Sequence, residues 1–531
     1  GNPSPATPPA GHTPPTPPKC HTDSISLTRN QGNNAIRLAT VFSGIGAIEH
    51  ALDRMNLNHK IVFACDNGDV DVLSKKVPED IFSIEKELSE LSTEISKINI
   101  QSEEDKLYKD ELNLILSKTN EEVEVYKKMN LHNSSENKIN RKIKDICQRT
   151  GMLHEKINSF RILKELSTLK TWTEKKNLVD SLYKGKEESN KVKKTYMANY
   201  DLDNKNFHWN VSFLDGNQYK DDVDLFVGGS PCQSFSLVGK QRGLADTRGT
   251  LFYEYARLVK EIRPKIFIYE NVKALLSNDE GRTWETISKV FTDLDYTWKK
   301  AVLNAKDYGI PQNRERVFVV GFRKDLKLEK EFEFPKPIKL EKKMQDFLIE
   351  NAPGGYFLPE KGVDFVTDEK NLTKRYTQID GEIQLCQKKN QQFNWHGDFV
   401  FQSEKEAKQK IKVDLEKYFL SEKVRKYVLA TGTKNFYSRP KTDLEVARPL
   451  LTTMHKMHRA GVDNYVTTDG RLRKLTPREC FRLMGFSDNF KIPVSDTSAY
   501  QQAGNSIVVD VLIHIMESIL ESYPQLLGEN K

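Results

Sequence analysis

Five short apolar runs, each rich in Val, Ile or Phe, constrain the fold of this chain more than any other feature of its sequence. The runs are RLATVFSG (37–44), IVFACD (61–66), DVDLFVGG (222–229), KIFIYENV (265–272) and RVFVVGF (316–322). Runs of this length are typical of strands buried on both faces of a parallel sheet. Helical segments such as GTLFYEYARLVKEI (249–262) lie between them. The alternation predicts an α/β fold with a Rossmann-like, doubly wound parallel sheet.

The composition divides the rest of the chain. Residues 1–36 open with 18 residues that contain eight prolines, which predicts a disordered leader outside the fold. The α/β domain is expected over 37–79, 200–325 and 468–531, the last part with helices at TPRECFRLMGF and AGNSIVVDVLIHIMESIL. Residues 326–467 mix polar, aromatic and basic residues with weak periodicity, so we expect a second, smaller domain there.

Residues 80–199 interrupt the α/β pattern with a segment rich in Lys, Glu, Ser and Asn. Within this segment apolar residues recur at steps of four and three, at Ile84, Leu88, Leu91, Ile95 and Ile98. Such a stripe predicts a helical hairpin or a coiled-coil-like insertion. A solvated, purely structural excursion is favoured over a module that contacts DNA or a partner protein.

Charge, hydropathy and cysteine spacing narrow the class of protein. The net charge of +7 is compatible with a nucleic-acid partner. No apolar stretch reaches the roughly 20 residues of a membrane span, and no signal peptide opens the chain, so we expect a soluble, cytoplasmic protein without a membrane partner. The six cysteines are at least 45 positions apart, which excludes the paired spacing of a zinc ribbon or redox site. We therefore predict reduced thiols and no metal site.

Ligands of doubly wound sheets bind at the carboxyl ends of the strands. Ser43, Gly44 and Gly46 follow the first apolar run, and Asp66 follows the second, 20 residues after Gly46. The glycines allow close approach of a ligand to a helix N-terminus, and the carboxylate can accept both ribose hydroxyls, which predicts a nucleoside cofactor. Glu49 stands where a dinucleotide motif has its third glycine, which disfavours pyrophosphate binding. A bare structural turn is the alternative.

The stretch VGGSPCQSFS (227–236) places Cys232 directly after a proline at the end of an apolar run. A buried, inert thiol is one alternative, and a disulfide or metal ligand is excluded because no partner cysteine is close in sequence. The proline fixes the backbone, the preceding glycines allow close approach, and a thiol at a strand-to-helix turn can have a lowered pKa. These features favour a nucleophile.

Two further features complete a candidate cleft. Glu270, with Asn271, ends the next apolar run, so a carboxylate and a thiol are expected at neighbouring strand ends, although Glu270 could be an ordinary strand-end residue. Arg314 and Arg316 are two residues apart at the start of another strand, so both should point the same way; the alternative is a pair of surface arginines. Such a cleft suits nucleophilic attack on a polar heterocycle that is protonated as it is attacked.

These residues belong to an ordered series of motifs that resembles the cytosine-C5 DNA methyltransferases of bacterial restriction–modification systems. The series is VFSGIGA, Asp66, GGSPCQSFS, GKQRGLADTRGTLF, YENV, DYGIPQNRERVF, RKLTPRECFRLMGF and AGNSIVVDVL. The resemblance covers roughly residues 37–79, 207–325 and 447–520. It implies a site-specific DNA (cytosine-5-)-methyltransferase with S-adenosyl-L-methionine as cofactor.

The resemblance also assigns catalytic roles. It implies that Cys232 attacks C6 of cytosine, that Glu270 bonds the N3 and amine edge of the base, and that Arg316 holds the O2 side with Arg314 beside it. Neither face of a stacked base is open to a thiol, so the cytosine must be flipped out of the duplex.

The cofactor positions implied by the resemblance include some departures from the family pattern. The matching positions are Phe42, Ser43, Gly44, Ile45, Gly46, Asp66, Asn67, Asn210, Leu251, Asn505 and Ser506. Ala47 replaces a frequent glycine, and Asn67 and Gly68 stand where an aromatic residue often stacks on the adenine. Asn210 stands where an aspartate usually binds the adenine amine, and Asp215 is an alternative for that role.

Double-stranded DNA is the implied substrate, and residues 326–467 correspond to a target-recognition domain. The GKQRG loop, with Lys240 and Arg242, resembles the family's mobile loop, and Gln233, Ser236 and Arg459 are further candidates for DNA contacts. Other basic and aromatic candidates, for which a solvated face is the alternative, are Lys434, Phe436, Tyr437, Arg439, His455, Lys456 and His458. We expect a monomer on DNA, with a cognate restriction endonuclease as a further partner. Methylation of tRNA and a catalytically silent DNA-binding relative remain the alternatives.

Overall fold

A computed structural model gives the fold of this protein over most of its length. It describes residues 35–132, 134–230, 244–247 and 249–349, and thereafter 364, 368–373, 377–379, 397–399, 415–430, 432–433, 436–437, 442–455, 458, 462–468 and 471–528. The leader predicted at 1–36 therefore lies almost wholly outside the described residues. The region predicted as a second domain is described in part.

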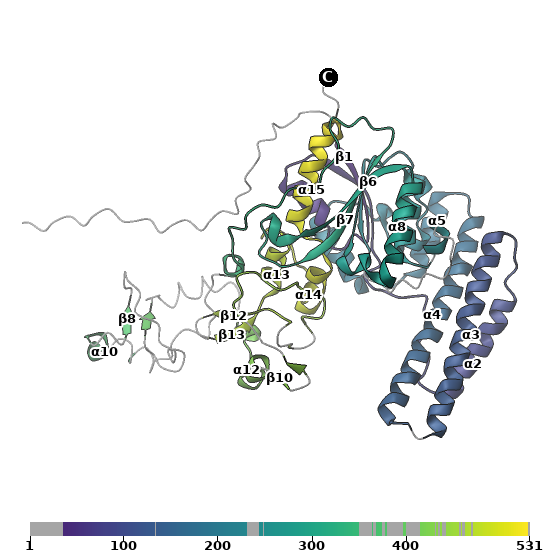
Figure 1. Ribbon diagram of the computed structural model, residues 1–531, viewed down its shortest axis with the longest axis horizontal. Coiled ribbons are helices and arrows are strands. Elements are labelled where there is room, and N and C mark those ends of the chain that lie inside the picture. The colour runs from purple at the N-terminus through teal and green to yellow at the C-terminus, as the bar shows by residue number, and fades with distance from the viewer. Residues whose placement is uncertain are drawn as a thin grey trace, which may run out of the picture.

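A seven-stranded sheet forms the centre of the molecule (Figure 1). Its strands are β1 (Ile36–Val41), β2 (His59–Cys65), β3 (Phe207–His208), β4 (Leu225–Gly229), β5 (Ile266–Val272), β6 (Tyr296–Asn304) and β7 (Glu315–Arg323). They lie in the order β3-β2-β1-β4-β5-β7-β6, and the pairs among β1 to β5 are parallel. The order reverses at β1 and β4, as in a Rossmann-like doubly wound sheet, which confirms the predicted fold class.

The prediction that the RVFVVGF run is a parallel strand was wrong. This run forms β7, which is antiparallel to both β5 and β6. The edge strand β6, which was not predicted, explains the difference. Only residues 305–314 connect β6 to β7, and a parallel crossover needs a dozen or more residues. The short connection therefore forces a hairpin, which places β7 between β5 and β6.

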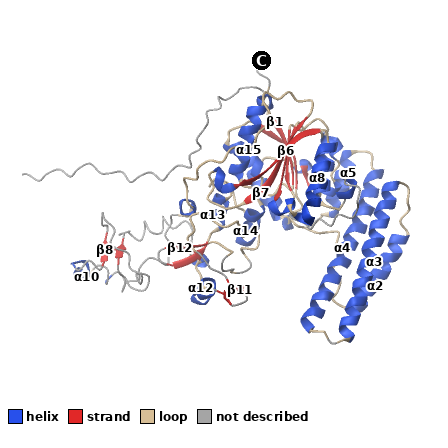
Figure 2. Cartoon of the chain, viewed as in Figure 1, coloured by secondary structure: helices blue, strands red, loops and turns tan. Residues whose placement is uncertain are grey.

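Helices cover both faces of the sheet (Figures 1 and 2). The strands alternate between two cores: Leu38, Leu225 and Ile266 belong to one, and the adjacent Ala39, Phe226 and Phe267 belong to the other. The first core receives α1 (Ala47–Arg54), α13 (Pro477–Leu483), α14 (Asp496–Asn505) and α15 (Val509–Ser522). The second receives α7 (Leu251–Ile262) and α8 (Arg282–Asp293). Both faces are thus buried, as the apolar runs indicated.

One helical stretch in the described part of the chain, Asp496–Ser522, is long and apolar enough to cross a membrane by length and composition. It comprises α14 and α15, which are separated at Ser506–Val508. Val509, Leu512 and Ile515 of α15 are fully or almost fully buried in the first core, against α1 and the sheet. The apolar character of this stretch is therefore explained by its place in the core.

The segment predicted as a helical insertion is helical. It contains α2 (Ile81–Ser96), α3 (Glu103–Leu131), α4 (Glu136–Thr168), α5 (Trp172–Leu182) and α6 (Lys191–Asn199). The helices α2, α3 and α4 form a bundle of three that projects from the α/β domain (Figure 1). Ile84, Leu88, Leu91 and Ile95 are buried in this bundle, whereas Ile98 follows the end of α2 and is half-buried. Unlike the bundle, α6 packs Tyr196 into the first core of the α/β domain.

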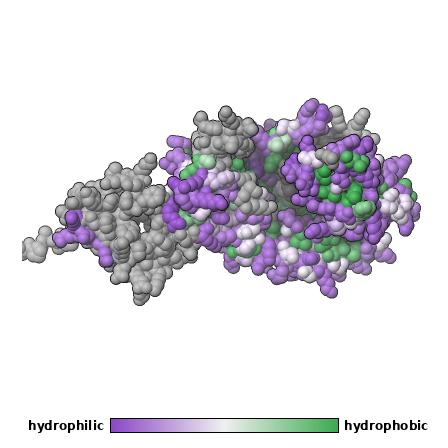
Figure 3. Space-filling view, turned by 90° about the horizontal axis from the view of Figure 1, so that it is seen from below, coloured by the Kyte–Doolittle hydropathy of each residue, from purple (hydrophilic) through white to green (hydrophobic). Residues whose placement is uncertain are grey.

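Short elements make up the described part of 326–467. They are α10 (Glu369–Thr373), β8 (Thr377–Ile379), β9 (Gly397–Phe399), α12 (Glu422–Leu429), β10 (Gly432–Thr433), β11 (Phe436–Tyr437) and β12 (Tyr465–Thr468), which pairs with β13 (Arg471–Lys474). The fully buried Arg473 of β13 donates to both carboxylate oxygens of Glu479 in α13, at 2.7 and 2.9 Å. This pair joins the β12–β13 hairpin to the α/β domain. The face seen in Figure 3 is mostly hydrophilic, with apolar patches between.

Candidate active site

The loop after β1 enters α1 through left-handed backbone conformations. Gly44 and Gly46 have φ of 54° and 88°, which glycine adopts without steric cost. Space also requires glycine at 46, because a Cβ there would overlap the ring of Tyr200. The Tyr200 hydroxyl donates to the Gly46 carbonyl at 2.7 Å. The loop therefore has a fixed shape, with backbone in place of side chains at its closest approach to α6.

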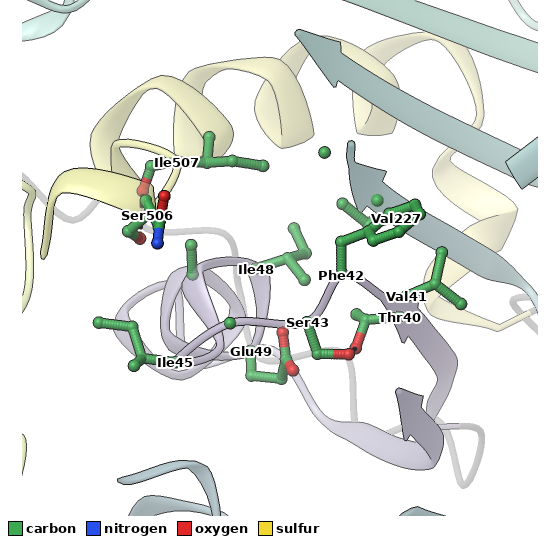
Figure 4. A pocket seen from close by; sticks show the side chains of 15 residues that line it. Thr40, Val41, Phe42, Ser43, Ile45, Ile48, Glu49, Val227, Ser506 and Ile507 are labelled. Atoms are coloured by element: carbon green, nitrogen blue, oxygen red, sulfur yellow. Dashed lines mark hydrogen bonds between the residues drawn. The ribbon is translucent and has the colours of Figure 1, made fainter. Parts of the chain in front are cut away.

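A pocket that opens to solvent lies beside this loop, at the carboxyl ends of β1 and β4 (Figure 4). Six of the predicted cofactor residues line it, namely Phe42, Ser43, Gly44, Ile45, Asn505 and Ser506. Ile48, Val227 and Ile507 add apolar side chains that the sequence analysis did not single out. The pocket thus combines a partly buried glycine turn with apolar walls, which suits an organic ligand with a polar end.

Asp66 lies at the end of β2 and is tied to the glycine loop. One carboxylate oxygen accepts from Gly44 N at 2.9 Å and the other accepts from Gly68 N at 2.8 Å. Burial raises the pKa of this carboxyl group, and the two backbone N–H groups partly offset that effect. Because each carboxylate oxygen can accept a second hydrogen bond, Asp66 keeps acceptor sites for ligand hydroxyls. Asn67 is exposed, and its Oδ1 accepts from Asp69 N at 2.9 Å.

The other adenosine-side candidates lie on different elements. Asn210 precedes a short turn, and its Nδ2 donates to the hydroxyl of Tyr183 at 3.1 Å. Asp215, the alternative candidate, is paired with Lys175 at 2.9 Å. Leu251 is the first residue of α7 and packs, like Phe42, against the second core. The described residues that line the pocket do not include five of the predicted cofactor residues, namely Gly46, Asp66, Asn67, Asn210 and Leu251.

Glu270 and Arg316 meet at the carboxyl end of β4. Nε of Arg316 lies 3.5 Å from Oε1 of Glu270. A Cβ at Gly229 would overlap the Glu270 carboxylate, so the carboxylate lies directly over the end of β4. Burial raises the pKa of Glu270, and the positive charges of Arg316 and Arg314 oppose this rise. The site therefore holds a largely buried acid beside a guanidinium group, as the strand ends predicted.

Arg314 has different partners from Arg316. Its guanidinium donates to the carbonyls of Leu450 (2.8 Å), Gly504 (2.7 Å) and Ser506 (3.3 Å). Burial lowers its pKa to about 9, so the group stays charged at neutral pH. Gln312, which the sequence analysis did not single out, accepts from Leu450 N at 3.1 Å and donates to Leu483 O at 2.7 Å. The segment before β7 thus joins the Glu270–Arg316 pair to the turn that lines the pocket.

A second group of polar residues fixes the chain at the end of β4. The hydroxyls of Ser230 and Tyr269 lie 2.7 Å apart, and Nδ2 of Asn271 donates to them at 3.0 and 2.9 Å respectively. All three residues are buried. The only signal of this group in the sequence was the presence of polar side chains, those of Tyr269 and Asn271, within the apolar run. The group holds the backbone two residues before Cys232.

Several predicted residues lie outside the described part of the chain: Cys232, Gln233, Ser236, Lys240, Arg242 and Arg459. The same holds for Pro231, Lys434, Arg439 and Lys456, whereas His455 and His458 are described.

Among the described residues, no group of three or more His, Cys, Asp or Glu could hold a metal ion. Cys65, Cys147 and Cys480 are free thiols.

Comparison with known proteins gives one consistent family. Residues 181–521 match the model of the C-5 cytosine-specific DNA methylases. The type II methyltransferase M1.ScrFI of Lactococcus lactis subsp. cremoris is 35% identical over 330 residues, which cover 62% of this chain and 69% of that protein. M.HhaI of Haemophilus parahaemolyticus is 35% identical over 305 residues (56% and 76%). The orphan methyltransferase M.SPRI of Bacillus phage SPR is 28% identical over 396 residues (62% and 90%).

Proposed function

The chain belongs to the C-5 cytosine-specific DNA methylases, and from this premise we propose that it is a site-specific DNA (cytosine-5-)-methyltransferase that uses S-adenosyl-L-methionine. The observation that carries the proposal is the placement of the Glu270 carboxylate over Gly229, at the end of the strand that leads to Cys232, with Nε of Arg316 3.5 Å from that carboxylate. An acid and a cation at this position can hold the polar edge of a pyrimidine beside a nucleophile. The proposed substrate of this protein is therefore a cytosine in double-stranded DNA.

The residues present fit the proposed cofactor. The glycine loop, Ile48 and Ile507 offer a partly apolar pocket, and Asp66 retains acceptor sites for the ribose hydroxyls. We assign Phe42, Ser43, Gly44, Ile45, Asn505 and Ser506 to the pocket, and Gly46, Asp66, Asn67, Asn210 and Leu251 to its margins. When bound, S-adenosyl-L-methionine supplies the methyl group. Backbone at the glycine turn and the Asp66 carboxylate would orient it.

The base-binding pair acts by proton placement and charge. Because burial raises the pKa of Glu270, this residue can carry a proton to the N3 edge of the cytosine ring. Arg316 would hold the O2 side and stabilise negative charge there. In the proposed reaction the thiolate of Cys232 forms a bond to C6 while N3 gains the proton. After C5 has gained the methyl group, a base would remove the C5 proton. The C5–C6 double bond would re-form as the bond between sulfur and C6 breaks, and Cys232 would leave as a thiolate while Glu270 takes back the proton from N3.

Access to C6 requires that the cytosine leaves the stack, so we propose base flipping. Lys240 and Arg242, with Gln233, Ser236 and Arg459, are proposed DNA contacts. A monomer would act on each site of intracellular DNA. Two of the similar proteins are named type II methyltransferases, which supports a restriction–modification role for this chain, with a cognate endonuclease as partner.

The first experiment is base-resolution methylation sequencing of plasmid DNA from a host that expresses the chain. The control is Cys232→Ala expressed at the same level. We expect 5-methylcytosine at one short motif with the native chain and none with the variant. An unmodified plasmid despite folded native protein would contradict the proposal, and methylated tRNA in the same cells would identify the alternative substrate. Methylation at the native rate by Cys232→Ala would refute the covalent mechanism.

A further inference from the structure

The helical insertion reaches the proposed cofactor site with two side chains. Tyr183 ends α5, and Asn190 precedes α6. Both residues are buried, with 2% and 0% of their surfaces exposed. Each contacts a residue assigned to the adenosine side of the cofactor, Asn210 or Asp66. The insertion is therefore in direct contact with the site.

The Tyr183 hydroxyl and Ser212 N hold the Asn210 amide from its two sides and together fix its orientation. Ser212 N donates to Oδ1 of Asn210 at 2.9 Å, which identifies that atom as the oxygen. Nδ2 on the other side of the amide donates to the Tyr183 hydroxyl at 3.1 Å. The Tyr183 ring is itself held by stacking on Trp209, with ring centres 4.6 Å apart and planes 9° from parallel. A carbonyl oxygen can accept two hydrogen bonds, so Oδ1 keeps one acceptor site for a ligand amine.

Asn190 fixes the backbone of the Asp66 turn. Its Nδ2 donates to the carbonyl of Asp66 at 3.0 Å, and its Oδ1 accepts from Lys193 N at 2.9 Å, which caps α6. A Cβ at Gly68 would overlap the Asn190 side chain, and Gly68 has φ of 59°. Glycine at position 68 is thus explained by the close approach of Asn190 and by the positive φ.

The larger packing supports these two contacts. Ile162 and Leu166 of α4 share a small core with Leu73, which follows the Asp66 turn, and with Phe213, which follows Asn210. Nδ2 of Asn158 in α4 also donates to the carbonyl of Leu73 at 2.7 Å. The insertion thus packs on both chain segments that carry the adenosine-side residues.

We propose that Tyr183 and Asn190 are positioning residues through which the helical insertion sets the affinity for the cofactor. Tyr183 turns the Asn210 amide so that its oxygen faces the adenine amine, which lets asparagine serve where an aspartate is usual. Asn190 holds the Asp66 turn in the shape that presents its carboxylate to the ribose. This inference rests on the proposed function, because it takes S-adenosyl-L-methionine as the ligand.

The test measures cofactor binding directly, by calorimetric titration of the full chain with S-adenosyl-L-methionine. Tyr183→Phe removes only the hydroxyl and keeps the stacked ring. Loss of one hydrogen bond that orients a binding group should raise the Kd roughly five- to tenfold. The matched control is Tyr126→Phe in α3 of the insertion, away from the site, which should leave the Kd unchanged. The unfolding midpoints of all variants are measured without ligand.

A second variant separates orientation of the amide from general support. Asn210→Asp replaces the amide by two equivalent acceptor oxygens, so no orientation is needed. In that background Tyr183→Phe should raise the Kd less than about twofold, because the orienting bond has lost its function. Asn190→Ala should raise the Kd as well, while the KM for DNA at saturating cofactor stays within twofold of the native value.

Three outcomes are decisive. A native Kd in Tyr183→Phe would overturn the inference while leaving the proposed function intact. If Tyr183→Phe raises the Kd equally in the native and Asn210→Asp backgrounds, Tyr183 acts by general support alone, and the inference is overturned. Folded native chain that binds no S-adenosyl-L-methionine would contradict the proposed cofactor, and the inference would fall with it.

Discussion

The carboxyl group of Glu49 offers a test of the energetics of this fold. Glu49 lies on α1 beneath the glycine loop, near Ser43 and Thr40 (Figure 4), and is fully buried. Its carboxylate lies beside the hydroxyls of Tyr196 and Thr40, which offset part of the cost of burial, but among the described residues neither carboxylate oxygen has a partner with the geometry of an ordinary hydrogen bond. Burial raises the pKa of Glu49 from 4.5 to about 7. The protonated, neutral form is therefore favoured in the folded state.

The sign of the resulting pH dependence follows from proton binding. Below pH 4.5 the carboxyl group is protonated in both the folded and unfolded states, so it makes no pH-dependent contribution. Between about pH 4.5 and 7 the unfolded state loses the proton first, and the free energy of unfolding falls as the pH rises. Above pH 7 the loss is complete. A shift from 4.5 to about 7 corresponds to about 3 kcal/mol.

Glu49→Gln keeps the size of the side chain and removes the titration. We expect the variant to gain about 2.5 kcal/mol relative to the native chain between pH 5 and pH 8.5, by integration of the same two pKa values. Urea unfolding at both pH values measures the gain, and Glu121→Gln on the exposed surface of α3 is the control. If the native chain and Glu49→Gln lose stability in parallel as the pH rises, Glu49 does not titrate as the burial argument requires.

Substitutions at two further positions, Arg314 and Gly229, test the packing around the base-binding pair. Arg314→Gln leaves the carbonyls of Leu450 and Gly504 without their buried donor, so the free energy of unfolding should fall by about 3 kcal/mol. Arg314→Lys should lose less stability, because it keeps a charged donor. Equal stability of Arg314→Gln and the native chain in urea unfolding would contradict a stabilising role of these hydrogen bonds. Gly229→Ala should push the Glu270 carboxylate from its position, and it should therefore lower the rate of methyl transfer roughly 100-fold at saturating substrates. A native rate in this variant would show that the carboxylate can move without loss of activity.

Much of the site could be predicted from the ends of the apolar runs. The position of Glu270 follows from its place at the end of β5, whereas its approach to Arg316 depends on the antiparallel pairing of β5 with β7, which the sequence did not predict. The glycine loop and Asp66 were predicted to lie together, and the Gly44 N–Asp66 hydrogen bond confirms that they do. These contacts depend on short-range strand geometry, which leaves a pattern in the sequence.

Contacts between distant segments left no such pattern. Arg314 was expected to point into the cleft beside Arg316, but its donors are bound to carbonyls 136 to 192 residues away in the chain. The antiparallel direction of β7 was also missed, because the amphipathic edge strand β6 has no continuous apolar run. Asn190 and Tyr183 lie in a segment whose composition favoured a solvated excursion over a module that contacts DNA or a partner, and neither reading predicted contact with the cofactor residues.

The sequence by itself determined the α/β class, the helical insertion and the strand-end candidates, since periodicity and turn residues are local properties of the chain. Only the tertiary structure decided the direction of β7, the different partners of Arg314 and Arg316, and the contact of the insertion with Asp66 and Asn210. The physical reason is that a buried polar group must find a partner somewhere, but its type does not say which distant backbone or side chain supplies that partner.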